Sequence, residues 1–261
     1  MTPLAAPPRL ALVPSLELDV ARAVRRLHRL CGAIAGSTVH HTVDGDPHPA
    51  LLASLVAAGG SFSVETPAKV RACLAVGARP EALVLGRLTD DGRLAVGGCL
   101  TEAATAGIRR FVVDSDLGCR EVAEVAPGSS VLCRVAGRAP GATGRHGRTP
   151  TEAVSVLVGA ARLGLDPAGV AVDVGAGRLN PVAWRASIAV ASSIFTALGK
   201  TGLRPWLLGV GGGLPAAHES GAPPTSLFAA AIDRALREEF GIRRPQTLVE
   251  LGRALGAAPV C

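Results

Sequence analysis

A dense run of metal-ligating and acid–base side chains lies near the start of the chain, in the stretch STVHHTVDGDPHP at residues 37–49. The stretch is typical of a buried strand that ends in a polar turn and continues into a helix opened by Pro49. On an alternating strand, His40, Thr42 and Asp44 share one face. Imidazole and carboxylate groups on one face suit a divalent metal or proton transfer. A core histidine with a satisfied hydrogen bond is the alternative for His40.

A glycine run offers a second kind of chemistry. Gly211–Gly213 follows the apolar run WLLGV and precedes a polar loop. Glycines ahead of a helix can present backbone N–H groups to an anion, so the run favours a phosphate or carboxylate site. An inherited tight turn is the alternative.

A regular alternation of apolar runs and helical stretches predicts the elements that position these residues. The candidate strands are Thr38–Val43, Ser61–Val64, Ala82–Leu85, Arg110–Val113, Val131–Val135, Val170–Val174, Trp206–Val210 and Thr247–Glu250. The helical stretches between them open with Pro and end at Gly in several cases. Continuously apolar strands suit a parallel sheet that is covered on both faces. Eight such units predict a (β/α)8 TIM barrel, with an open doubly wound sheet as the alternative.

We expect one domain over residues 1–261, with the barrel proper at about 37–255 and a leader strand and helix at 9–31. In a barrel of this kind the functional site lies at the carboxyl ends of the strands. The chemistry-bearing residues follow predicted strands, as that rule requires.

Composition excludes several classes of function. The formal net charge is +6, but the positive charge is almost all arginine spread along the chain, so nucleic-acid binding is not expected. No apolar run reaches the roughly 20 residues that span a bilayer, so no membrane partner is expected. The six cysteines have no CxxC spacing, and the first residues lack a basic segment followed by an apolar core. These features predict a cytoplasmic protein.

A set of motifs recurs in order along the chain: FVVDS (111–115), VAPGSSVLCRV (125–135), GLDPAGVAVDVG (164–175), AWRA (183–186), GLRPWLLGVGGGLP (202–215) and VELGRA (249–254). Together they resemble the barrel domain of fold-type III pyridoxal-phosphate enzymes, especially the diaminopimelate and ornithine decarboxylases. The resemblance runs from about Leu16 to Leu255 and implies an alanine racemase-like barrel. The family's C-terminal β-domain is expected to have no counterpart before Cys261.

The resemblance breaks at two cofactor positions. The lysine that forms the Schiff base in the family matches Asp44, and a carboxylate cannot condense with an aldehyde. The histidine that stacks on the pyridine ring matches Asp173. Lys69 and Lys200 fall in predicted helices of the outer ring and are not expected to replace the lysine. We therefore expect no cofactor; the alternatives are pyridoxal phosphate without a covalent bond, or a divalent metal on His40, Asp44 and Asp173.

Other cofactor positions are retained. The resemblance implies that they hold the phosphate and the ring in the family: Gly211, Gly212 and Gly213 in the phosphate turn, Glu250 at the pyridine nitrogen, and the arginines Arg134 and Arg253. Asp44, Asp173 and Glu250 would then share one low-dielectric cup. Repulsion and burial would raise the pKa of at least one carboxyl group, giving a general acid near neutral pH.

These substitutions predict a cofactor-independent acid–base enzyme of the lyase, isomerase or cyclase type. Asp44 and Asp173 would act as acid and base, and Glu250 would tune the cup. The two arginines and the glycine turn would bind a small anionic substrate with a carboxylate or phosphate group. The alternative is a pseudoenzyme that binds a ligand or regulates a decarboxylase partner. A homodimer, or a heterodimer with a decarboxylase-like chain, is the expected assembly.

Overall fold

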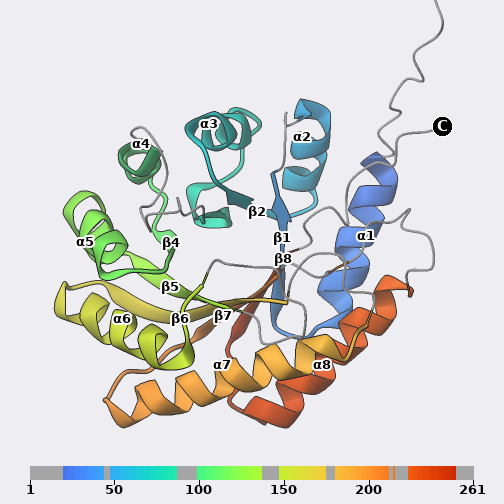
Figure 1. The fold of residues 1–261 in the computed structure, drawn as a ribbon. Helices are drawn as coiled ribbons and strands as arrows, with labels where there is room; N and C mark the ends of the chain where they lie inside the picture. The colour runs from blue at the N-terminus through green and yellow to red at the C-terminus, as the bar shows by residue number, and fades with distance from the viewer. Residues whose placement is uncertain are drawn as a thin grey trace, which may run out of the picture.

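The computed structural model describes residues 20–43, 48–86, 99–136, 147–174, 180–211, 214 and 223–250. Eight strands form a closed barrel in chain order, β1 to β8 (Figure 1). The strands are β1 (Ser37–Thr42), β2 (Ser61–Val64), β3 (Leu83–Leu85), β4 (Arg110–Val113), β5 (Ser130–Val135), β6 (Asp166–Asp173), β7 (Leu207–Gly211) and β8 (Gln246–Glu250). All neighbours are parallel, and β1 pairs with β8 as well as β2. The predicted TIM barrel is confirmed, and the open-sheet alternative is wrong.

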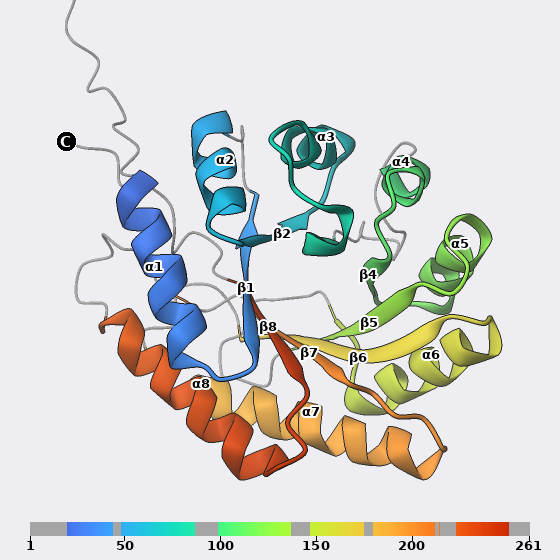
Figure 2. The same ribbon diagram turned by 180° about the vertical axis from the view of Figure 1, so that it is seen from behind.

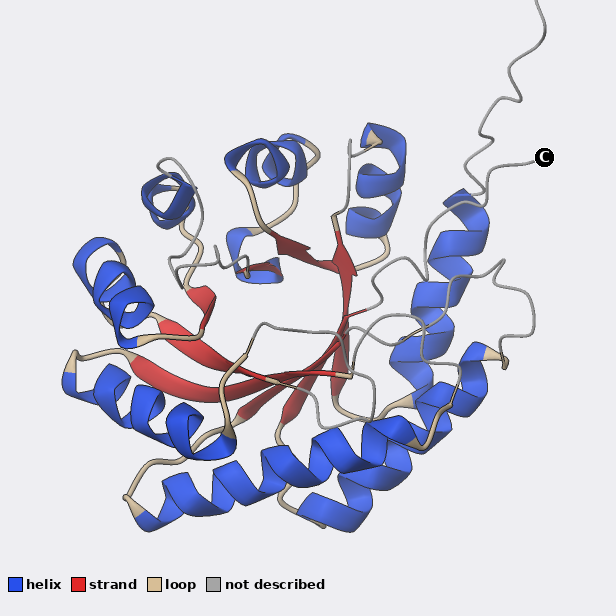
Figure 3. Ribbon diagram, in the orientation of Figure 1, coloured by secondary structure: helices blue, strands red, loops and turns tan. Residues whose placement is uncertain are grey.

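Helices surround the sheet on its outer side (Figure 3). They are α1 (Val20–Ala33), α2 (Pro49–Ala57), α3 (Pro67–Ala75), α4 (Cys99–Thr105), α5 (Asp116–Val125), α6 (Pro150–Arg162), α7 (Ala183–Lys200) and α8 (Thr225–Phe240). Helix α1 precedes the barrel and packs beside α8 and α2 (Figure 2). A short 3-10 turn, Pro80–Ala82, leads into β3.

Local sequence explains where several helices begin. Thr66 accepts a hydrogen bond from the backbone N–H of Lys69, and Pro67 occupies the first turn of α3. Thr149 and Glu152 form a capping box at the start of α6, also with a proline in the first turn. Each of these helices follows a strand in the chain, so the carboxyl ends of the strands and the first turns of the helices share one face of the barrel.

Strand β6 begins earlier than its apolar pattern predicts, at Asp166 rather than Val170. The register with β5 shifts at this point, and Gly169 has a φ of +154°. A Cβ at Gly169 would lie 1.9 Å from the carbonyl oxygen of Leu207, so only glycine fits. The irregular start explains why alternation alone missed these residues.

The predicted leader strand lies outside the described residues, so the domain boundaries stay a prediction. Within the described ranges, no helix is both long enough and apolar enough to cross a bilayer.

Candidate active site at the barrel mouth

The space inside the barrel contains two layers of different chemistry. The lower layer is a small apolar cluster, separate from the main core between sheet and helices: Val84, Val112, Leu132, Ala168, Leu207 and Leu248. Because side chains alternate along a strand, the same inner face continues two residues later at Gly86, Arg134 and Glu250. We call this upper layer, with Ser63, Glu65, Asp173 and Gly211, the mouth. It lies at the carboxyl ends of the strands, where barrel enzymes carry their sites.

Glu250 is the central group of the mouth. It ends β8, is partly exposed, and accepts a 2.9 Å hydrogen bond from Ser63 Oγ to its Oε1. Loss of water contact raises the pKa of Glu250, and the nearby Asp173 and Glu65 charges raise it further. The Arg134 guanidinium and the Ser63 hydrogen bond act in the opposite direction. Glu250 is thus a carboxylate of increased basicity, held in place by a hydroxyl group.

Gly211 leaves the space that the Glu250 carboxylate occupies. A Cβ at Gly211 would lie 2.8 Å from Glu250 Oε2. Gly211 therefore fits the mouth for a steric reason, whether or not it also binds phosphate. Gly212 and Gly213, the other two predicted phosphate-binding residues, lie outside the described residues.

Arg134 is positioned by the neighbouring strands. Its Nη2 donates a 2.6 Å hydrogen bond to the carbonyl oxygen of Gly86. Its buried Nε has no hydrogen-bond partner among the described residues. The guanidinium balances part of the negative charge around Glu250 and keeps one donor for a ligand.

Asp173 ends β6 and pairs in register with Gly211. Its charge acts on Glu250, so the structure brings together two of the three predicted catalytic carboxylates. Asp44 and the predicted substrate-binding Arg253 lie outside the described residues. The assignment of catalytic roles to these groups stays a prediction.

His40 lies inside the barrel, opposite Glu250 in the β1–β8 register, and is fully buried. Burial, together with the Arg110 charge, lowers its pKa to about 4, so the ring is neutral at pH 7. Among the described residues, no group of three histidine, cysteine or acidic side chains is placed to hold a metal. Asp44 is outside that set, so the alternative metal site of His40, Asp44 and Asp173 stays a prediction.

Two residues of the mouth, Ser63 and Glu65, were not predicted from the sequence. The signal was present in the segment SFSVE (61–65), where polar residues alternate with apolar ones. On a strand whose outer face is buried by helices, that alternation places Ser61, Ser63 and Glu65 on the inner face.

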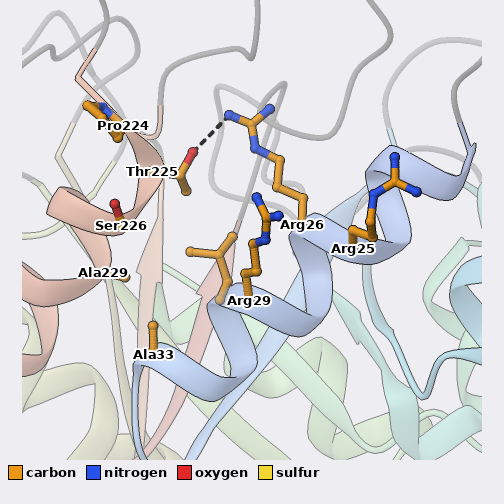
Figure 4. Close-up of a pocket in the computed structure, with 9 residues that line it drawn as sticks. Arg25, Arg26, Arg29, Ala33, Pro224, Thr225, Ser226 and Ala229 are labelled. Atoms are coloured by element: carbon orange, nitrogen blue, oxygen red, sulfur yellow. Dashed lines mark hydrogen bonds between the residues drawn. The ribbon is translucent and has the colours of Figure 1, made fainter.

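A second concave site lies on the outer surface, between α1 and the first turn of α8 (Figure 4). It has a volume of about 330 Å³ and is lined by Arg25, Arg26 and Arg29 together with Thr225 and neighbouring residues. Arg26 Nη2 donates a 2.8 Å hydrogen bond to Thr225 Oγ1. We call it the arginine pocket; none of the predicted site residues that the structure describes lines it.

The sequence matches the family model described as "Pyridoxal-dependent decarboxylase, pyridoxal binding domain" over residues 19–257. That range contains the whole barrel. The chain belongs to the pyridoxal-dependent decarboxylase family. It is 26% identical over 215 residues to a lysine/ornithine decarboxylase of Selenomonas ruminantium, covering 81% of this chain and 53% of the relative. It is 22% identical over 232 residues to ornithine decarboxylase of Rattus norvegicus, covering 86% and 49%. The chain thus spans about half the length of the curated relatives that it matches.

Solved structures of decarboxylases share the fold. The arginine decarboxylase of Paramecium bursaria Chlorella virus bound to agmatine has a TM-score of 0.79 at 20% identity, over 90% of this chain and 63% of that one. The structure of SrLDC in complex with PLP and cadaverine has a TM-score of 0.79 at 22% identity, over 90% and 59%. The resemblance read from the sequence motifs is confirmed at the level of family and fold.

Family membership corrects two predictions. A cofactor-independent lyase, isomerase or cyclase is wrong, and so is the expectation of no cofactor, because the matching domain is the pyridoxal-binding one. Decarboxylases are lyases, so that part agrees with the family, whereas the isomerase, cyclase and pseudoenzyme alternatives gain no support. The physical reason for the error is that Asp44 removes one attachment of the cofactor, while Glu250 and Arg134 remain in the mouth.

The described residues fit one end of pyridoxal phosphate. A carboxylate of raised pKa at the end of β8 suits a protonated pyridine nitrogen, and Gly211 leaves room for that carboxylate. On β6, Asp173 offers no ring to stack on the pyridine. The sequence position that matches the family's lysine is Asp44, which is not an amine.

Proposed function

We propose that this chain binds pyridoxal phosphate in the mouth of the barrel and serves a lyase reaction of the decarboxylase type on an amino acid. The observation that carries the proposal is the position of Glu250, a basic carboxylate fixed by Ser63 at the end of β8. The relatives act, by their names, on lysine, ornithine or arginine, so a basic amino acid is the proposed substrate class. This replaces the anionic metabolite expected from the sequence.

The bound cofactor supplies an electron sink for the carbanion that loss of carbon dioxide leaves on the substrate. Glu250 would hold a proton at the pyridine nitrogen, and its raised pKa favours that sharing. Ser63 orients the carboxylate. Arg134 limits the excess negative charge and offers its free Nε to an anionic ligand group.

Asp173 has a different proposed role from the family residue that it replaces. Its carboxylate lies close enough to act on the charge of Glu250, at the edge of the same site. There it would hold the ammonium group of a basic amino acid by charge-assisted hydrogen bonds. A homodimer, or a heterodimer with a decarboxylase-like chain, stays the proposed assembly.

A titration with pyridoxal phosphate, followed by equilibrium dialysis, tests the proposal. Glu250→Ala should weaken binding by about tenfold or more, the equivalent of about 1.4 kcal/mol. Arg29→Ala, in the exposed arginine pocket, is the matched control and should leave the affinity unchanged. Equal affinity in wild type and Glu250→Ala, with weaker binding in Arg29→Ala, would move the cofactor to the outer surface and end the proposal.

A further inference from the structure

Lys69 lies in a helix of the outer ring, as expected, but its side chain is largely buried. Lys69 is in the first turn of α3, and its Nζ is 3.2 Å from Glu65 Oε2. Only 11% of the Lys69 side chain is exposed. In a helix, long side chains point back toward the amino terminus, so this one reaches toward the end of β2.

Glu65 connects this ion pair to the mouth. It directly follows β2 and continues the inner face of Ser61 and Ser63. Ser63 binds Glu250, and the charge of Glu65 raises the pKa of Glu250. The Lys69 ammonium is therefore attached to a carboxylate that belongs to the same electrostatic cluster as Glu250.

The position is also adjacent to the place where the family carries its lysine. Strand β2 pairs with β1, and Ser63 lies opposite Thr42 in that register. Residue 44 follows two positions after Thr42, and Glu65 follows two positions after Ser63. An amine held by Glu65 thus lies near the carboxyl end of β1, the strand that precedes Asp44 in the sequence.

We propose that Lys69 is the amine that condenses with the aldehyde of pyridoxal phosphate, a role moved from the end of β1 to the first turn of α3. The inference rests on the proposed function, because it needs the cofactor in the mouth. The ammonium first passes a proton to the Glu65 carboxylate. The amine nitrogen then adds to the aldehyde carbon, the oxygen leaves as water, and a C=N bond forms without any oxidant or reductant.

The chain contains one other lysine, Lys200, which serves as an internal control. Lys200 is the last residue of α7, exposed, at the end of the barrel opposite the mouth. If exposure alone decided which lysine reacts with the cofactor, Lys200 would react. A lysine that reacts because the mouth holds the cofactor next to it would be Lys69.

The experiment is to incubate the full chain with pyridoxal phosphate, reduce with sodium borohydride, digest, and locate the pyridoxyl group by mass spectrometry. The label should lie on the peptide of Lys69. It should disappear in Lys69→Arg, which keeps the charge beside Glu65, and persist in Lys200→Arg. Dialysis of unreduced samples measures cofactor binding separately, and thermal melts check that each variant is folded.

The outcomes separate the two proposals. Binding that depends on Glu250, with label absent from Lys69 or equal on Lys200 and the amino terminus, would overturn the role of Lys69 and leave the proposed function standing. No binding that depends on Glu250 would overturn both.

Discussion

The two layers inside the barrel differ sharply although the same strands build them. Leu132 and Arg134 are two positions apart on β5, and Leu248 and Glu250 are two positions apart on β8. The lower residues form an apolar cluster, and the upper ones form a charged mouth. The lower layer is what burial of a barrel requires for stability, whereas the upper layer places charge where burial disfavours it. This difference supports the proposal that the mouth serves chemistry rather than stability.

The largest effect should come from the lower layer. Leu132 is fully buried inside the barrel, so Leu132→Ala leaves a cavity and should lower the free energy of unfolding by about 2 to 5 kcal/mol. Urea denaturation measures this loss. Where the variant is folded, its affinity for pyridoxal phosphate should equal that of wild type. A loss of less than about 1 kcal/mol would mean that this layer is not a packed core.

The upper layer should make the free energy of unfolding depend on pH, through Glu250. Because the pKa of Glu250 is raised in the folded protein, the folded state binds that proton more tightly than the unfolded chain does. This stabilisation is complete below the unfolded pKa and is lost as pH rises through the folded pKa. Wild type should therefore lose stability relative to Glu250→Gln as pH rises across that window.

Denaturation of both proteins at a series of pH values tests the sign. Glu250→Gln leaves the other charged side chains of the mouth in place, so the difference between the two proteins reports on Glu250. A difference that stays constant, or that increasingly favours wild type at higher pH, would contradict the description of the mouth.

The smallest effect belongs to neither layer. Thr149 caps α6 on the outer ring, so Thr149→Ala should lower the free energy of unfolding by about 1 kcal/mol. Cofactor affinity should not change, because Thr149 contacts Glu152 and not the mouth. Thermal denaturation measures the loss of stability, and dialysis measures the cofactor affinity. Weaker cofactor binding in this variant would show that the mouth depends on the stability of α6.

The barrel could be predicted from the sequence because its signals are local. Eight apolar runs, with Pro at helix starts such as Pro67 and Pro150, give strands and helices in the right order. The irregular start of β6 was missed, because the contact of Gly169 with the carbonyl oxygen of Leu207 is made across two strands.

The site was only partly predictable. Glu250, Arg134 and Asp173 were placed correctly at the strand ends. The ion pair of Lys69 with Glu65 was not predicted, because it becomes visible only in three dimensions. The function was mispredicted because one substitution, Asp44, was given more weight than the residues that remain in the mouth.

A crystal structure of the protein grown with pyridoxal phosphate is the most direct test of the proposed cofactor site beside Glu250. We predict density in the mouth, with the pyridine nitrogen at hydrogen-bond distance, about 2.6 to 3.2 Å, from the Glu250 carboxylate. Density for the cofactor in the arginine pocket between α1 and α8, with none beside Glu250, would contradict it.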